Sequence, residues 1–194
     1  MASVIAIGPA GFPGGSTVLS FTGLPNGAEV NGLTVSGVSF GYSLGNGALV
    51  IDGGPGITNN INPPNIVSVG NNSGVLTVTF PSLVNLFGYG YAVLNTGPVA
   101  NATTINLFNG ATPVGTLSYN GVSDPNFSGG FAGISSTLAF NRAQLTFNSV
   151  AAPAFALDNL TFAATGVPEP STTTMIATGI AVLFWRRSVA ARKS

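Results

Sequence analysis

The sequence contains no cysteine and no histidine, and these two absences exclude most catalytic and zinc-binding chemistry. Without cysteine there is no disulfide, no thiol nucleophile and no thiolate metal ligand. Without histidine, Ser-His-Asp and Cys-His hydrolysis and histidine-bound zinc are excluded. Paired carboxylates remain as a glycosidase acid and base, but the four acids of residues 1–165 are scattered and lie in no recognisable motif. We therefore predict that the protein is not an enzyme.

Charge is also scarce, and what there is of it is unevenly divided. Charged residues make up 5% of the 194 residues, while hydrophobic residues make up 45%, a composition that predicts a folded domain and not a disordered segment. Residues 1–165 hold four acids and one arginine, a net charge of −3, whereas residues 166–194 hold one acid and four bases, a net charge of +3. The first part has no lysine and no basic surface for phosphates, so nucleic acid is not an expected partner.

The first 165 residues form short runs rich in β-branched and aromatic residues, separated by glycine, proline and asparagine. This pattern is typical of antiparallel strands. It predicts an all-β body, an antiparallel two-sheet sandwich of the jelly-roll type, with an eight-stranded barrel as the alternative. The expected strands are 17–22, 35–43, 48–52, 75–80, 86–94, 103–108, 115–119, 131–135, 143–148 and 155–162.

Alternation within these segments predicts which side chains face the core. Every second residue from Leu76 to Phe80 is apolar, which is the pattern of a half-buried strand. In the segment 155–162 (FALDNLTF) the apolar positions change parity at Asp158 and Asn159. One extra residue in the strand would restore the register, so we expect a β-bulge at this point.

Two regions carry strong turn signals. Asn109 and Gly110 predict a hairpin with a loop longer than two residues. Residues 51–65 contain glycines, prolines and asparagines in a density that excludes a regular strand or helix. We expect a long surface loop there, which is either a functional loop or one that the fold simply tolerates.

Two short acidic segments are candidate calcium ligands, and no other cofactor is expected. Asp52 precedes the glycine- and asparagine-rich loop, and Asp158 and Asn159 lie at the expected bulge. Carboxylate and amide oxygens are ligands that Ca²⁺ accepts. The alternative is that both aspartates cap turns through hydrogen bonds to the neighbouring backbone.

Tyrosines supply the candidate contacts to sugars. The segment FGYGY places Phe87, Tyr89 and Tyr91 on one face of a strand. This row is either a glycan-binding platform, with Tyr89 and Tyr91 as its stacking residues, or a buried aromatic row in the core. The sequence leaves both interpretations open.

The C-terminal end differs from the body. Fourteen uncharged residues, 172–185, are followed directly by Arg186 and Arg187. As a helix they would span roughly 21 Å, which is shorter than the roughly 30 Å of bilayer hydrocarbon. Snorkelling arginines and local thinning of the bilayer can close this gap. We expect a short transmembrane helix with a basic tail at 172–194, and the positive-inside rule then places the body on the exported side.

This end of the chain resembles the PEP-CTERM sorting tail of exported bacterial proteins. The resemblance is carried by the order of a Pro-Glu-Pro segment, an apolar span and paired arginines, namely Val167, Pro168, Glu169, Pro170, Arg186 and Arg187. It implies a body at 1–165, an extended processing segment at 166–171 and an anchoring helix at 172–194. It also implies transport across the inner membrane, a transient anchor in that membrane and cleavage near Pro-Glu-Pro by an exosortase-type membrane protease.

The same resemblance sets the functional expectation. Its members are delivered to the cell surface or the extracellular space, in systems that accompany exopolysaccharide and biofilm production. We therefore expect a non-enzymatic surface or matrix protein, with a lectin-like module acting on exopolysaccharide as the alternative. Such proteins begin with a signal peptide, and MASVIAIGPA has no basic region and too short an apolar stretch. We expect that this leader is missing from the sequence.

Overall fold

The computed structural model describes residues 2–70 and 72–164. The chain divides into two units, and the first, Met1–Ala164, contains all of the described residues. The first unit is all-β with antiparallel pairing throughout its described ladders, as the sequence predicts. The segments expected at 166–171 and 172–194 lie outside the described residues. Within residues 2–70 and 72–164, the structure contains no helix with the length and apolarity needed to cross a membrane.

The described elements are eleven strands and one 3₁₀ turn, several of them very short and two of them very long. In chain order they are β1 (Val4–Ala6), η1 (Pro9–Gly11), β2 (Thr17–Leu19), β3 (Thr34–Val35), β4 (Val38–Tyr42), β5 (Leu49–Asp52), β6 (Asn65–Ser68), β7 (Leu76–Val93), β8 (Val99–Asn109), β9 (Thr112–Asp124), β10 (Phe127–Phe147) and β11 (Phe155–Ala163).

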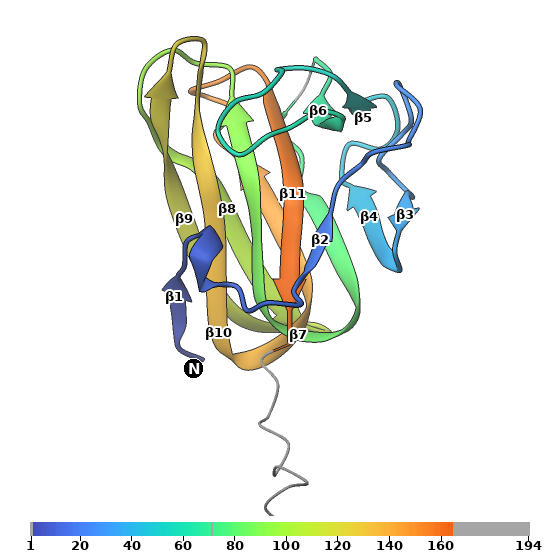
Figure 1. Cartoon of the computed structure of the whole chain (residues 1–194), viewed down its shortest axis with the longest axis vertical. Helices are drawn as coiled ribbons and strands as arrows, with labels where there is room; N and C mark the ends of the chain where they lie inside the picture. Colours follow the sequence, from blue (N-terminus) through green and yellow to red (C-terminus); the bar gives the residue numbers. More distant parts are fainter. Residues whose placement is uncertain (1, 71, 165–194) are drawn as a thin grey trace, which may run out of the picture. The chain divides into compact units, whose positions relative to one another are not determined.

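All the strands belong to one hydrogen-bonded sheet that folds over into two layers (Figure 1). Layer 1 contains β5, β6, β11, residues 86–93 of β7 and residues 128–135 of β10. Layer 2 contains β4, residues 76–80 of β7, residues 142–147 of β10, β8 and β9. The expected sandwich therefore has its two layers within a single sheet, because β7 and β10 are long enough to bend and continue from one layer into the other.

The core lies between the layers and is held by aromatic contacts that join them. The ring of Phe147 in layer 2 stacks on the ring of Phe155 in layer 1 with centroids 3.7 Å apart. Phe80 and Phe162 form a second contact of this kind at 5.2 Å. Leu76, which the alternation places inward with Phe80, is fully buried. Aromatic pairs with ring centroids 4.5–7 Å apart, as for Phe80 and Phe162, add about 0.5–1.5 kcal/mol beyond the burial of their area.

The bounds of several strands differ from the expectation. The expected strand 35–43 is a hairpin of β3 and β4, because Ser36 and Gly37 both have a positive φ (49° and 81°) and turn the chain. The hairpin at Asn109 closes through only two residues, since Asn109 pairs with Thr112. The loop expected to be longer is therefore a two-residue turn.

Other expected pairs of strands are continuous. Segments 75–80 and 86–94 are both parts of β7, and segments 131–135 and 143–148 are both parts of β10. The two strands remain paired at their bend, where Val84 lies opposite Phe140. In the sequence, the apolar alternation is interrupted between these segments, and the interruption predicted the end of a strand. In the structure, β7 and β10 stay paired with each other, so each strand continues past the interruption.

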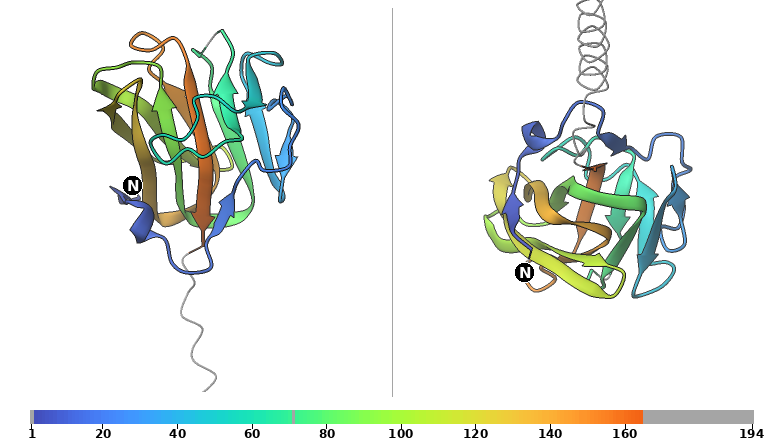
Figure 2. Two further views of the ribbon diagram at one scale, coloured as in Figure 1. Left: turned by 45° about the horizontal axis from the view of Figure 1, so that its top comes forward. Right: turned by 90° about the horizontal axis from the view of Figure 1, so that it is seen from below.

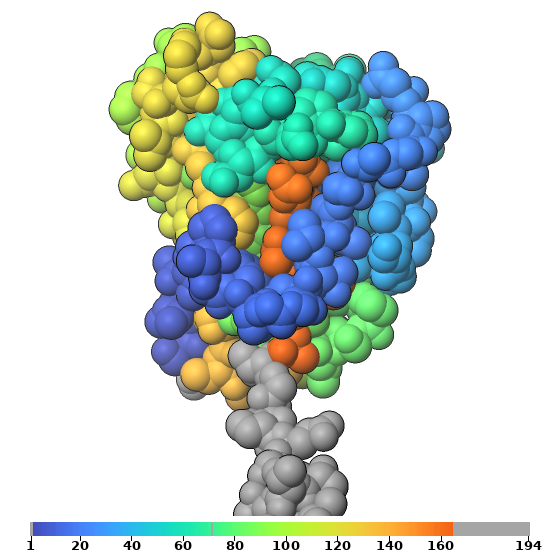
Figure 3. Space-filling model, in the orientation of Figure 1, coloured from blue at the N-terminus to red at the C-terminus, as the bar shows by residue number. Residues whose placement is uncertain are grey.

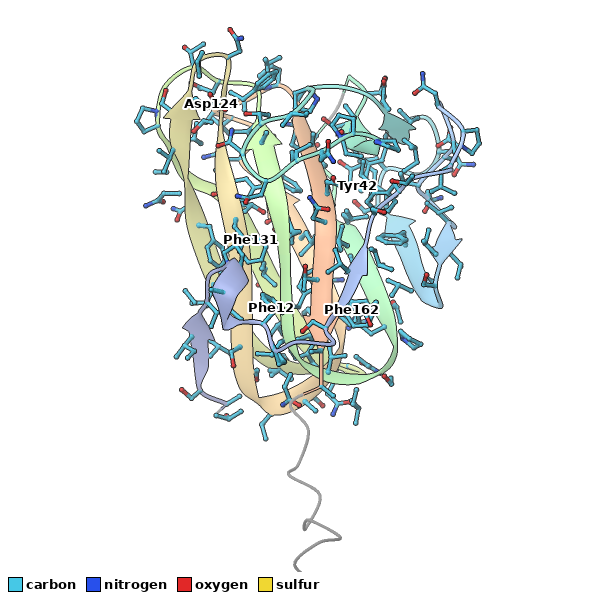
Figure 4. All side chains as sticks on the ribbon, in the orientation of Figure 1. Phe12, Tyr42, Asp124, Phe131 and Phe162 are labelled. Carbon is cyan, nitrogen blue, oxygen red and sulfur yellow. The ribbon has the colours of Figure 1, made fainter. Side chains whose placement is uncertain are left out.

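Two irregular segments cover the outer face of layer 1, which is the face turned away from the core. Loop 53–64 crosses the upper part of β11, and residues of the N-terminal segment cover its lower part (Figures 2 and 3). In the N-terminal segment, the ring of Phe12 makes an edge contact with the ring of Phe131 at 5.9 Å (Figure 4). Glycines on β7 permit this close cover: a Cβ on Gly90 would lie 2.2 Å from the backbone oxygen of Asn60.

We predict that Gly90→Ala displaces loop 53–64 and lowers the free energy of unfolding by about 1–3 kcal/mol, because the new methyl group overlaps the backbone of the loop. The matched control is Gly41→Ala on β4, where a Cβ meets nothing within 4 Å. Equilibrium urea unfolding measures both changes, and limited proteolysis reports whether the loop is released. Equal unfolding midpoints for the two variants would contradict the close packing of the loop.

Candidate functional site

The β-bulge expected at Asp158 and Asn159 is present and holds loop 53–64 in place. The pairing of β11 with β7 shifts register between Asp158 and Thr161, and Asn159 has a φ of 52°. The carboxylate Oδ2 of Asp158 accepts the N–H of Asn62 at 3.0 Å. The side-chain amide of Asn159 donates to the backbone oxygen of Asn60 at 2.9 Å. The bulge therefore contributes two neighbouring side chains that bind the backbone of the loop.

The carboxyl group of Asp158 is unusual because it is completely buried. Its side chain has an exposed fraction of 0%. Burial raises the pKa of this carboxyl above its ordinary value, and hydrogen bonds from the N–H groups of Asn62 and Asn159 partly oppose that rise. The second carboxylate oxygen, Oδ1, is buried and has no hydrogen-bond partner. Buried polar atoms in proteins usually have a hydrogen-bond partner, and Oδ1 of Asp158 has none among the described residues.

The structure brings the two predicted acidic segments together. Asp52 ends β5 and lies opposite Asn65, the first residue of β6. The pairing of β6 with β11 joins Ile66 to Leu157, and continuing this register by one residue places Asn65 opposite Asp158. Residues that lie opposite one another in neighbouring strands share a face. Asp52, Asn65 and Asp158 therefore form one row, which we call the polar row, on the outer face of layer 1.

Asn65 is the member of the polar row that sequence reasoning missed. Its side chain is fully buried, its amide nitrogen donates to the backbone oxygen of Gly54, and its Oδ1 has no hydrogen-bond partner. Asp52 accepts the N–H of Gly53, so it also caps its own turn as the alternative interpretation proposed. The sequence signal that could have identified Asn65 is its position directly after two prolines and before an apolar run.

Tyr89 and Tyr91 belong to the core, and the glycan-platform interpretation of these residues is wrong. They are 0% and 1% exposed, respectively, so neither ring offers a face to a sugar. The hydroxyl of Tyr89 forms a hydrogen bond with Thr103 in layer 2, and that of Tyr91 donates to the backbone oxygen of Asn120. The alternation of FGYGY points these rings inward because the glycines between them occupy the outer face.

An apolar groove of about 280 Å³ lies beside loop 53–64 on the same outer face, with Pro55, Leu94 and Phe127 among its lining residues. Phe127 begins β10 and pairs with Asp124 across a tight turn. Asp124, at the upper end of the body in Figure 4, accepts a hydrogen bond from the hydroxyl of Thr58 in the loop. The groove is thus lined by apolar and glycine residues, and Phe127 gives it a partly exposed aromatic ring.

The residues of the C-terminal motif lie outside the described residues, and so their geometry forms no part of this site. They are Val167, Pro168, Glu169, Pro170, Arg186 and Arg187.

Comparisons with solved structures give similarities of low identity. A mutant of CBM29-2, a family 29 carbohydrate-binding module complexed with mannohexaose, has a TM-score of 0.39 and 10% identity, covering 76% of this chain and 91% of its own. A family 11 carbohydrate-binding module of the cellulosomal cellulase Lic26A-Cel5E of Clostridium thermocellum has a TM-score of 0.37 and 10% identity, covering 78% and 95%. Both TM-scores lie below 0.5.

No curated protein matches the sequence as a whole. The C-terminal end gives a specific match, to the PEP-CTERM protein-sorting motif, over residues 166–188. This stretch contains the Pro-Glu-Pro segment, the apolar span and the paired arginines in the order described above. Residues 166–188 of this chain are a PEP-CTERM protein-sorting motif, placed at its C-terminal end.

Proposed function

We propose that the protein is an exported, non-enzymatic protein of the bacterial surface or extracellular matrix, and that its C-terminal motif delivers it there. The observation that carries this proposal is the sorting motif at residues 166–188, which begins directly after a compact β body ending at Ala164. For the body we propose a sandwich of the jelly-roll type. Its low charge and its many asparagines suit a protein that acts by contact and not by turnover.

In this proposal the three parts of the tail have separate roles. The apolar span anchors the chain transiently in the inner membrane, and Arg186 and Arg187 stay on the cytoplasmic side. An exosortase-type protease then cleaves near Pro168, Glu169 and Pro170. The two prolines restrict φ and favour an extended backbone, which is the form in which a protease cleft accepts a chain. Release leads to the cell surface or the extracellular space.

The surroundings of the body's acids support a role without catalysis. Each of the four carboxylates accepts a hydrogen bond from a nearby group: Glu29 from the N–H of Gly47, Asp52 from Gly53, Asp124 from Thr58 and Asp158 from Asn62. Asp158, the acid with a raised pKa, is fully buried beneath loop 53–64, where a polysaccharide cannot reach it. These acids serve the packing of loops and strands.

We predict that Glu169→Ala abolishes cleavage at the motif and leaves the uncleaved chain in the membrane fraction. Replacing Arg186 and Arg187 together by Ala should disturb retention or orientation, because the positive charge that stays on the cytoplasmic side is reduced. Mass spectrometry of the mature protein measures both effects. Glu29→Ala removes the same charge from the body and should leave the mature mass otherwise unchanged. Unaltered processing in the two tail variants would contradict the proposal.

A glycan-binding module acting on exopolysaccharide is the second candidate function. The groove beside loop 53–64 favours it, because the ring of Phe127 and the apolar surface of Pro55 form a floor against which a sugar ring can pack. The tyrosines of β7 have no part in this surface, since they are buried.

If this second function holds, Phe127→Ala should weaken binding of purified exopolysaccharide about tenfold, which corresponds to about 1.4 kcal/mol. Calorimetric titration of the full-length protein measures the affinity. Phe108→Ala is the matched control, because Phe108 lies on layer 2 with the guanidinium of Arg142 4.7 Å from its ring centre. Absence of any heat of binding in the unaltered protein would remove the glycan-binding candidate and leave the sorting proposal intact.

A further inference from the structure

The polar row presents two unpartnered oxygen atoms in neighbouring strands. Oδ1 of Asn65 and Oδ1 of Asp158 are both buried, and neither has a hydrogen-bond partner. The other polar atoms of these side chains are engaged: the amide of Asn65 donates to Gly54, and Oδ2 of Asp158 accepts from Asn62. Opposed residues in antiparallel strands have Cβ atoms about 4.5–5.5 Å apart. A positive partner between these neighbouring strands would satisfy both buried acceptors.

No side chain of the described residues supplies this positive charge. The only basic side chain in residues 2–70 and 72–164 is Arg142, which belongs to β10 in layer 2 and lies over Phe108. The polar row also includes the carboxylate of Asp52 on β5. Together its three side chains offer two carboxylates and one amide oxygen as ligands. A buried carboxylate without a neighbouring cation is costly, and a bound metal ion removes that cost.

We propose that Asp52, Asn65 and Asp158 bind a Ca²⁺ ion beneath loop 53–64. Carboxylates, amide oxygens and backbone carbonyls are the ligands of Ca²⁺, which accepts six to eight of them in irregular arrangements. Mg²⁺ requires a near-ideal octahedron and retains its water, and the absence of histidine and cysteine removes the ligands that Zn²⁺ favours. The loop also places the backbone carbonyl of Gly54 beside Asn65, whose amide donates to it.

The ion would have a structural role. It would join β5, β6 and β11 to the loop that covers them, and so would bind the outer face of layer 1 together. Extracellular calcium modules have dissociation constants of roughly 10⁻⁴–10⁻³ M. The affinity expected for two carboxylates and one amide lies in the same range.

The test is the thermal unfolding of the full-length protein, freed of metal with EGTA and then titrated with CaCl₂ or MgCl₂. At a Ca²⁺ concentration tenfold above the dissociation constant, the unfolding midpoint should rise by about 3–6 °C. Mg²⁺ should give a smaller rise. Asp158→Asn and Asp52→Asn should each abolish the Ca²⁺-dependent rise, whereas Glu29→Gln, which removes a carboxylate elsewhere, should keep it.

A further variant keeps the test decisive if Asp158→Asn fails to fold. Asn65→Asp adds a third carboxylate to the row, so it should tighten Ca²⁺ binding and enlarge the calcium-dependent rise. A reduced or unchanged rise in Asn65→Asp would overturn the proposal, as would a rise that persists in Asp158→Asn, because the ion would then bind elsewhere.

The third contradicting outcome is that Ca²⁺ leaves the unaltered protein unchanged.

Discussion

One extra residue in β11 determines how both faces of layer 1 are used. Phe155 and Leu157 point into the core before the bulge, and Leu160 and Phe162 point into it afterwards, so the inner face stays apolar along the whole strand. Without the bulge, the second half of the strand would turn its apolar side chains to the outer face. The bulge also places a carboxylate and an amide where they bind the backbone of loop 53–64. The core and the outer cover therefore depend on the same local irregularity.

Scarcity of charge shapes the rest of the body. Where other proteins use lysines and acids at the surface, this one uses asparagine amides that pair with backbone groups of the loops. The side chains of Asn72 and Asn95 donate to the backbone oxygens of Ala152 and Ala151, and that of Asn148 donates to Ala100. These bonds satisfy backbone groups that no strand ladder pairs. The loops are held by hydrogen bonds from neutral amides. The four carboxylates also accept hydrogen bonds from groups of the loops and turns.

The C-terminal motif and the β body differ in where their specificity lies. The C-terminal part is a protein-sorting motif, and its information lies in a short linear order of residues. The body contains its own core and packs its irregular segments tightly against glycine-lined strands. The groove beside loop 53–64 and the polar row buried beneath this loop lie together on one face of layer 1.

The sequence by itself determined the all-β class, the inward faces of the half-buried strands, the bulge at Asp158 and the sorting motif, because each depends on side chains within a few residues of one another. Tertiary structure decided that segments 75–80 and 86–94 form one bent strand, that Tyr89 and Tyr91 are sealed between layers, and that Asp52 and Asp158 share one row. These features depend on which distant strands pair and on what covers them. Such pairings arise from the burial of the whole core, and a local pattern carries no record of the partner that lies across the sheet.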